Sequence, residues 1–113
     1  MKNAGFFAMI SRMKYINRWG LMRNTRSENL SEHSLDTAVI AHAPALIGNR
    51  RLGKQYNAER AALLCTYHDT SEIITGDLPT PAKYYPDEIR YAYWAVERLA
   101  QHISLSMLPE DLR

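Results

Sequence analysis

The sequence predicts an all-α fold, and three observations carry this prediction. Apolar residues recur at steps of three and four through most of the chain, which is the spacing of side chains on one face of a helix. No stretch alternates apolar and polar residues with a period of two over a useful length, so the sequence holds no clear strand signal. Glycine, proline and asparagine divide the periodic stretches into four expected helices, and helices without a sheet bury their apolar faces against one another.

The first expected helix covers residues 4–16. Phe6, Ile10 and Met13 follow one another at steps of four and three, so they share a helical face that can enter a core. Residues 17–29 hold few apolar side chains and several arginines and asparagines. We therefore expect a loop between the first helix and the second.

The second expected helix covers about residues 32–47. Ser31 can cap its N-terminus by accepting a hydrogen bond from a backbone N–H of the first turn. Pro44 interrupts the pattern, and because proline in a helix interior costs about 3 kcal/mol, we expect a kink or an early end there. Residues 48–54 are expected to form a loop. The inner face of this helix is expected to consist of Leu35, Ala38, Val39, His42 and Leu46.

The third and fourth expected helices are delimited by residues that favour helix ends. Asn57 can cap a third helix of about residues 58–74, and Gly76 can close it. Pro86 suits the first turn of a fourth helix, and Pro109 ends it. The inner face of the fourth helix is expected to consist of Ile89, Tyr93, Val96, Ala100, Ile103 and Met107.

The composition is typical of one soluble globular domain, since the 113 residues are 46% hydrophobic and 23% charged. The formal net charge of +2 is too small to predict a nucleic-acid partner, and no apolar run approaches the roughly 18 residues of a membrane span. Cys65 is the sole cysteine, which suits the reducing cytoplasm, and we interpret its thiol as a small core side chain. We expect a cytoplasmic protein that binds neither nucleic acid nor membranes.

His68, Asp69 and Glu72 form a cluster of titratable residues on the third expected helix. Residues three and four apart are neighbours on a helix, and a divalent cation would satisfy all three side chains, since imidazole and carboxylate are common metal ligands. In the alternative interpretation, the first two form a local hydrogen bond and Glu72 is solvated. A further histidine from another helix would be needed for a metal site, and the chain offers His33, His42 and His102.

Longer motifs point to a known family. SEHS at residues 31–34, followed by YHDTSE at residues 67–72, resembles the HD-domain metal-dependent phosphohydrolases. Two longer segments, FFAMISRMKYINRWGLMRNTRSENLSEHS and YHDTSEIITGDLPTPAKYY, closely resemble the bacterial 5′-deoxynucleotidases of the YfbR type. The likeness covers nearly all 113 residues, and it implies an all-α, HD-domain helical bundle.

The resemblance also implies roles for individual residues. His33, His68 and Asp69 match the family's metal ligands, and His33 and Asp69 also match residues that bind the substrate. Glu72 matches a carboxylate near the reacting phosphate that helps to activate water. Arg18 matches the residue that orients the substrate phosphate. The further residues that match the family's substrate pocket are Trp19, Asp77, Leu78, Pro79 and Thr80. In the alternative interpretation, Arg18 is an ordinary surface charge, Trp19 is a core anchor, and the loop at residues 77–81 only stops a helix.

The sequence departs from the family pattern at its end. The family's last aspartate ligand lies on a later helix, and neither Asp87 nor Asp111 fits that motif. We therefore interpret residues 1–113 as the N-terminal part of a single HD domain, truncated before the last metal-ligand helix. Loss of the missing helices is expected to expose apolar faces of the third and fourth helices.

The function implied for the intact protein is that of a metal-dependent 5′-deoxynucleotidase, a phosphoric monoester hydrolase. It would convert deoxyribonucleoside 5′-monophosphates to deoxynucleoside and phosphate, with Co, Mn, Zn or Fe as cofactor, and the resemblance also implies a homodimer. Alternatives are an HD phosphohydrolase for another nucleotide and a non-catalytic regulatory module with the HD fold. A nucleic-acid binder that uses Arg18, Arg23 and Arg26 would show salt-sensitive binding.

Overall fold

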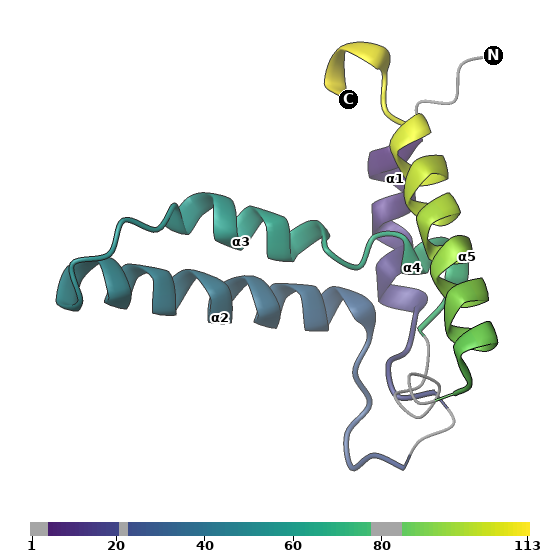
Figure 1. The fold of residues 1–113 in the computed structure, drawn as a ribbon, viewed down its shortest axis with the longest axis horizontal. Helices are drawn as coiled ribbons and strands as arrows, with labels where there is room; N and C mark the ends of the chain where they lie inside the picture. Colours follow the sequence, from purple (N-terminus) through teal and green to yellow (C-terminus); the bar gives the residue numbers. More distant parts are fainter. Residues whose placement is uncertain (1–4, 21–22, 78–84) are drawn as a thin grey trace. The chain divides into compact units, whose positions relative to one another are not determined.

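The computed structural model describes residues 5–20, 23–77 and 85–113 (Figure 1). Within these ranges the regular secondary structure is helical, apart from an isolated antiparallel bridge between Asn17 and Asn29, which confirms the all-α prediction. The chain divides into two compact units. One unit is continuous and consists of Ser31–Asp69; the other consists of the described residues of Met1–Leu30 and Thr70–Arg113.

The discontinuous unit begins with α1 (Phe6–Ile10), which runs directly into the 3₁₀ helix η1 (Ser11–Tyr15). The sequence predicted one regular helix here. The chain tightens instead at its end, where the backbone N–H of Ile16 donates to the carbonyl of Met13 at 3.2 Å, a three-residue step. Phe6 and Met13 are both buried, as expected for the two ends of the predicted apolar face.

The C-terminal part of this unit holds α4 (Glu72–Thr75), α5 (Asp87–Ser106) and the 3₁₀ helix η3 (Glu110–Leu112). Gly76 closes α4 with φ of 75°, in the left-handed region where glycine pays no steric cost, as the sequence predicted. Helix α4 contacts both η1 and α5. A small apolar pocket is lined by Phe6, Met9, Ile10, Thr70, Ile73, Ile74, Ser104 and Met107.

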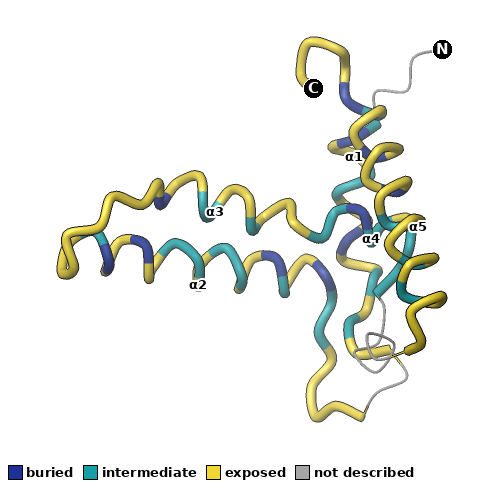
Figure 2. The backbone as a smooth tube through the Cα atoms, viewed as in Figure 1, coloured by how far each residue is buried: buried dark blue, intermediate teal, exposed yellow. Residues whose placement is uncertain are grey.

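The inner face of α5 differs from the predicted one. Ile89, Val96 and Ile103 are exposed, although the sequence placed them inside. The less accessible positions follow a neighbouring stripe at alternating steps of three and four (Figure 2): Arg90, Tyr93, Glu97, Ala100, Ser104 and Met107. Three positions of the predicted face, Tyr93, Ala100 and Met107, belong to this stripe, so the prediction was right for these and wrong for Ile89, Val96 and Ile103.

The continuous unit is a pair of helices, α2 (Leu30–Arg51) and α3 (Ala58–Tyr67), which run side by side in opposite directions (Figure 1). Helix α2 begins at Leu30, so Ser31 lies inside its first turn and is not the expected cap. The reason is visible in the backbone. The N–H of Leu30, one of the groups that a helix start leaves without an intrahelical partner, donates to the carbonyl of Ile16 at 2.8 Å.

Helix α2 also ends later than predicted. It continues through Pro44 and includes residues 48–51, which the sequence placed in a loop. Proline removes one helical hydrogen bond, but the turns on either side persist. The chain turns at Gly53, with φ of 64°, and the carbonyl of Gly48 accepts from the N–H groups of both Leu52 and Lys54.

The inner face of α2 uses small side chains. Ser34 and Ala45 are buried, whereas Leu35 and Val39 of the predicted face are 66% and 59% exposed. An open groove of about 400 Å³ lies in this unit, lined by Pro44, Ala45, Tyr56, Asn57, Arg60, Ala61 and Leu64. The large apolar side chains that lie exposed in this unit include Leu35, Val39, Ile40, Leu46, Ile47, Leu63 and Leu64.

Two asparagines fix the connection between α2 and α3. The side-chain amide of Asn49 donates to the carbonyl of Tyr56 at 2.9 Å, and its oxygen accepts from the N–H of Tyr56 at 2.7 Å. Asn57 caps α3 as predicted, because its side-chain oxygen accepts from the N–H of Arg60 at 3.0 Å. Of the helices that the structure describes, none combines the length and the apolar character that a membrane span requires.

Candidate functional site

The His-Asp pair lies at the end of α3 and not in the middle of a helix. The sequence predicted one helix over residues 58–74, but α3 ends at Tyr67, residues 68–71 form a turn, and α4 starts at Glu72. Short three-residue hydrogen bonds, such as that from the N–H of Ile73 to the carbonyl of Thr70, mark this turn. The interruption separates Asp69 from Glu72, so these two carboxylates are not successive residues of one helix face.

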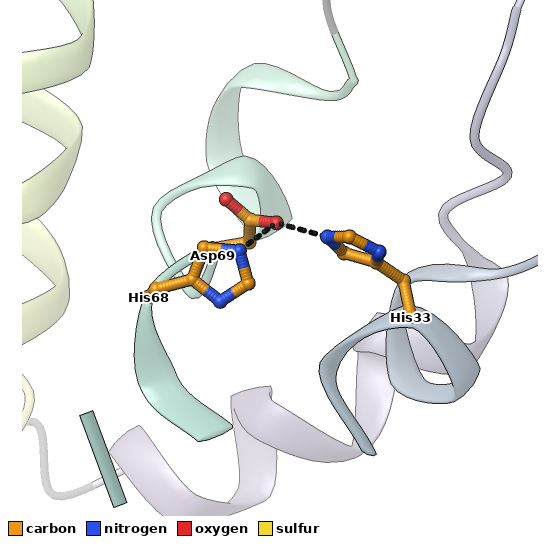
Figure 3. A group of neighbouring side chains, drawn as sticks. All are labelled: His33, His68 and Asp69. Atoms are coloured by element: carbon orange, nitrogen blue, oxygen red, sulfur yellow. Dashed lines mark ion pairs between the residues drawn. The ribbon is translucent and has the colours of Figure 1, made fainter. Parts of the chain in front are cut away.

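His33, His68 and Asp69 lie close together (Figure 3). Oδ2 of Asp69 is 2.8 Å from Nε2 of His68 and 3.2 Å from Nε2 of His33, which comes from the first turns of α2. One ligand atom from each residue lies within 4.8 Å of the other two. Two imidazole nitrogens and a carboxylate oxygen therefore converge on one point, as a divalent cation requires.

Hydrogen bonding orients the ring of His68. Its Nδ1 is 2.6 Å from the carbonyl oxygen of Cys65, in the last turn of α3. A carbonyl can only accept, so Nδ1 carries the hydrogen, and in the neutral ring Nε2 presents a lone pair to the oxygen of Asp69. Two acceptors at this distance repel unless a proton or a metal cation lies between them. Backbone orientation of a histidine ring in this way is common at metal sites.

The three side chains are partly accessible. The exposed fraction is 21% for His33 and for Asp69, and 36% for His68. Within the described ranges, this group is the one set of at least three His, Cys, Asp or Glu side chains whose ligand atoms converge. The two other histidines that the sequence offered, His42 and His102, do not belong to it.

Arg18 and Trp19 lie in the discontinuous unit, next to each other and in contact. Nη1 of Arg18 is 3.1 Å from Oε2 of Glu28, and its guanidinium carbon lies 5.0 Å from the centre of the Trp19 ring. The backbone N–H of Trp19 donates to Oδ2 of Asp77 at 3.0 Å. Three residues assigned to the substrate pocket from the sequence are therefore connected within this unit.

Trp19 has a backbone conformation that is rare for a large side chain. Its φ is 63°, and it is the one non-glycine residue with positive φ among those described. The left-handed region costs an L-residue roughly 1–2 kcal/mol, so local contacts must hold it. Nothing in the sequence predicted a positive φ at Trp19, since this conformation is usually predicted only at glycine or asparagine.

Tyr93 on α5 joins Glu72 and Asp77 to one polar cluster. Burial raises the pKa of Tyr93 above 10.0; a side-chain hydrogen bond with Thr75 acts in the opposite direction, and the carboxylates of Glu72, Glu97 and Asp77 raise the pKa further. Sequence reasoning treated Tyr93 as a core residue and missed its polar role. Its hydroxyl group, in an otherwise apolar pattern, was the available signal.

The remaining predicted site residues are placed as follows. Glu72 is the first residue of α4 and is half-buried. Leu78, Pro79 and Thr80 lie outside the described residues. The His33–His68–Asp69 group belongs to the continuous unit, whereas the other described site residues belong to the discontinuous one: Arg18, Trp19, Glu72 and Asp77.

Comparison with known families shows to which family this chain belongs. The model of the family described as 5′-deoxynucleotidase YfbR-like matches residues 5–113. The chain belongs to this family. That match includes every site residue predicted from the sequence, and it agrees with the all-α secondary structure of an HD-domain bundle.

Relatives of this YfbR-like chain are known in Salmonella. Proteins named 5′-deoxynucleotidase YfbR from Salmonella paratyphi B, Salmonella newport and Salmonella heidelberg are each 58% identical to it over 113 residues. The aligned region is 100% of this chain and 57% of each relative. The YfbR-like chain thus spans little more than half the length of these relatives.

Proposed function

We propose that this chain is part of a metal-dependent 5′-deoxynucleotidase, which hydrolyses deoxyribonucleoside 5′-monophosphates to a deoxynucleoside and phosphate. The observation that carries the proposal is the convergence of Nε2 of His33, Nε2 of His68 and Oδ2 of Asp69. Family membership supports the substrate class, since the relatives carry the name of that activity.

His33, His68 and Asp69 would hold the cation, and His33 and Asp69 would also contact the bound substrate. Their donor set, two imidazoles and one carboxylate, suits Co or Mn, and also Zn or Fe. When bound, a divalent cation makes water more acidic and offsets negative charge on phosphoryl oxygens. The hydrogen bond from His68 to the carbonyl of Cys65 would keep the ligand nitrogen aimed at the site.

Arg18 would grip the phosphate, because a planar guanidinium can donate two parallel hydrogen bonds to it. Trp19 would stack on the base or sugar. Glu72 would accept a proton from the attacking water as the water oxygen bonds to phosphorus. The bond from phosphorus to the 5′-oxygen breaks, and this oxygen takes up a proton from Glu72 or solvent to become the hydroxyl group of the deoxynucleoside. The sugar would be held by the loop of Asp77, Leu78, Pro79 and Thr80, whose tight fit would exclude a ribose 2′-hydroxyl.

The wider assignments follow from the same family resemblance. We assign residues 1–113 to the N-terminal part of a single HD domain, in a cytoplasmic enzyme that acts as a homodimer. No nucleic-acid or membrane partner is part of the proposal, because the net charge of +2 is small. An experiment on oligomeric state would be analytical ultracentrifugation of the full-length protein.

The test of the function is phosphate release from deoxythymidine 5′-monophosphate and from its ribose counterpart. The full-length protein and the 113-residue chain are assayed with Co or Mn and with a chelator. The expected result is metal-dependent release from the deoxynucleotide by the full-length protein, and little release by the 113-residue chain. Release by the full-length protein should be abolished by His68→Ala and retained by His102→Ala, which changes a histidine outside the group. Equal turnover of both nucleotides would contradict the sugar selectivity. No release from either would reject the proposed activity.

A further inference from the structure

The main chain around Arg18 is paired with a segment ten residues further along. The N–H of Arg18 donates to the carbonyl of Glu28 at 2.9 Å, and the N–H of Leu30 donates to the carbonyl of Ile16 at 2.8 Å. These two hydrogen bonds flank the antiparallel bridge described above. They fix the register of the two segments, so the position of Glu28 relative to Arg18 is set by the backbone.

The side chains of the same two residues form an ion pair. Nη1 of Arg18 is 3.1 Å from Oε2 of Glu28, with exposed side-chain fractions of 22% and 27%. The guanidinium of Arg18 also lies 5.0 Å from the ring centre of Trp19. Glu28 thus contacts Arg18 twice, through its main chain and through its carboxylate, while Trp19 contacts the guanidinium through its ring.

These contacts bear on the proposed role of Arg18 in phosphate binding, because they hold its guanidinium in place. A mobile arginine loses conformational entropy when a ligand fixes it, and a guanidinium that is already oriented avoids most of that loss. A guanidinium carries five N–H donors on three nitrogens. Because the ion pair engages Nη1, a phosphate can bind the other nitrogens while the pair persists.

We infer that Glu28 is a positioning residue that orients the guanidinium of Arg18 for phosphate binding. This inference rests on the proposed function insofar as Arg18 is the residue that grips the substrate phosphate. Glu28 acts through Arg18 and not on the substrate. The negative charge of Glu28 competes with the phosphate for the guanidinium of Arg18. Any gain in phosphate binding must therefore come from the orientation of the guanidinium and not from the charge of Glu28.

Two variants of Glu28 separate an effect of geometry from an effect of charge. Glu28→Ala removes the acceptor and releases the guanidinium. Glu28→Gln removes the charge but keeps a side-chain oxygen that can accept from Nη1. Positioning by geometry predicts that the glutamine variant works and the alanine variant does not. Glu88→Ala is the matched control, because it removes an exposed carboxylate from the first turn of α5 in the same unit.

The kinetic test uses the full-length enzyme with deoxythymidine 5′-monophosphate. Glu28→Ala is expected to lower kcat/KM about tenfold, whereas Glu28→Gln and Glu88→Ala stay within about threefold of the unchanged enzyme. In an Arg18→Ala background, Glu28→Ala is expected to have no further effect, since its target is gone. Losses that multiply in the double variant, or equal losses in the glutamine and alanine variants, would overturn the inference.

A spectroscopic readout separates this inference from the proposed function. In ¹⁵N NMR spectra of the folded protein without substrate, the side-chain Nε–H signal of Arg18 reports whether the guanidinium is held. The signal is expected to be ordered in the unchanged protein and in Glu28→Gln, and averaged by motion in Glu28→Ala. An ordered signal in Glu28→Ala would overturn the positioning role even if the enzyme is active. A protein without nucleotidase activity that still shows the expected pattern would reject the function and keep the positioning role.

Discussion

The backbone N–H of Trp19 donates a 3.0 Å hydrogen bond to the carboxylate of Asp77, 58 residues further along the chain. Trp19 has φ of 63°, a conformation with a cost of roughly 1–2 kcal/mol. The hydrogen bond offsets part of that cost. It also ties the segment that carries Arg18 to the start of the predicted substrate loop.

Loss of this bond should destabilise the discontinuous unit. Asp77→Ala is expected to lower the free energy of unfolding by roughly 0.5–1.5 kcal/mol, because it removes an exposed hydrogen bond to the N–H of Trp19. Asp77→Asn keeps an oxygen at that position and is expected to lose less. Urea unfolding followed by circular dichroism measures both. Equal losses in the two variants would show that the charge, and not the hydrogen bond, stabilises this conformation.

The polar cluster at Tyr93 predicts a dependence of stability on alkaline pH. Burial raises the pKa of Tyr93 above 10.0 in the fold, so between the unfolded and folded pKa values the unfolded chain has lost a proton that the folded chain retains. Stability from this residue is therefore complete below the unfolded pKa and falls as pH rises through the folded pKa.

Tyr93→Phe tests this dependence. The variant is expected to lose about 1 kcal/mol of stability near neutral pH, because it lacks the hydrogen bond with Thr75. Its unfolding free energy should then fall less steeply than that of the unchanged chain above pH 10.0. Urea midpoints measured across this range give the comparison, and parallel curves for the two proteins would contradict the assignment.

Cation binding should stabilise the unit that contains His33, His68 and Asp69. A ligand at a hundred times its Kd adds about 2.7 kcal/mol to the folded state. Adding Co or Mn is therefore expected to raise the Tm, and a chelator should reverse the change. Asp69→Asn should abolish the rise, whereas Asp36→Asn, at an exposed position of α2, should keep it. A rise that persists in Asp69→Asn would place the cation elsewhere.

The two hydrogen bonds between the side chain of Asn49 and the backbone of Tyr56 should stabilise the α2–α3 connection, and substitutions of Asn49 should lower the free energy of unfolding in a graded way. Asn49→Ala removes both hydrogen bonds to the backbone of Tyr56 and is expected to cost roughly 1–3 kcal/mol. Asn49→Asp keeps the acceptor but not the donor, so its loss should be intermediate. Arg50→Ala, at an exposed neighbouring position, serves as the control. The unfolding free energy of all three variants, from urea titrations, checks this order.

The sequence predicted those helix ends that depend on a capping residue and its immediate neighbours. Asn57 and Gly76 were identified correctly because capping requires only the residue and its neighbours. The start of α2 could not be predicted, since it depends on the carbonyl of Ile16, which is distant in sequence. The break after Tyr67 was also missed, because residues 58–74 form a good helical pattern.

The candidate site likewise combines features that the sequence predicted with features that it could not predict. The motif resemblance selected His33 from the available histidines, and the structure places His33 beside His68 and Asp69, although their role as metal ligands stays a prediction. Spacing alone could not have made this selection. The partner of Trp19 and the rotated face of α5 depend on tertiary contacts that no window of sequence contains.

The division of the fold has a consequence for biosynthesis. One unit needs Met1–Leu30 and Thr70–Arg113 together, whereas Ser31–Asp69 is continuous. On a ribosome, Phe6 and Met13 emerge before Ser31–Asp69, and the helices α4 and α5 that complete their unit emerge only after it. At roughly 5–20 residues per second, the apolar N-terminal face waits for seconds without its partners. The order of synthesis therefore delays the burial of Phe6 and Met13 until the whole continuous unit has been made.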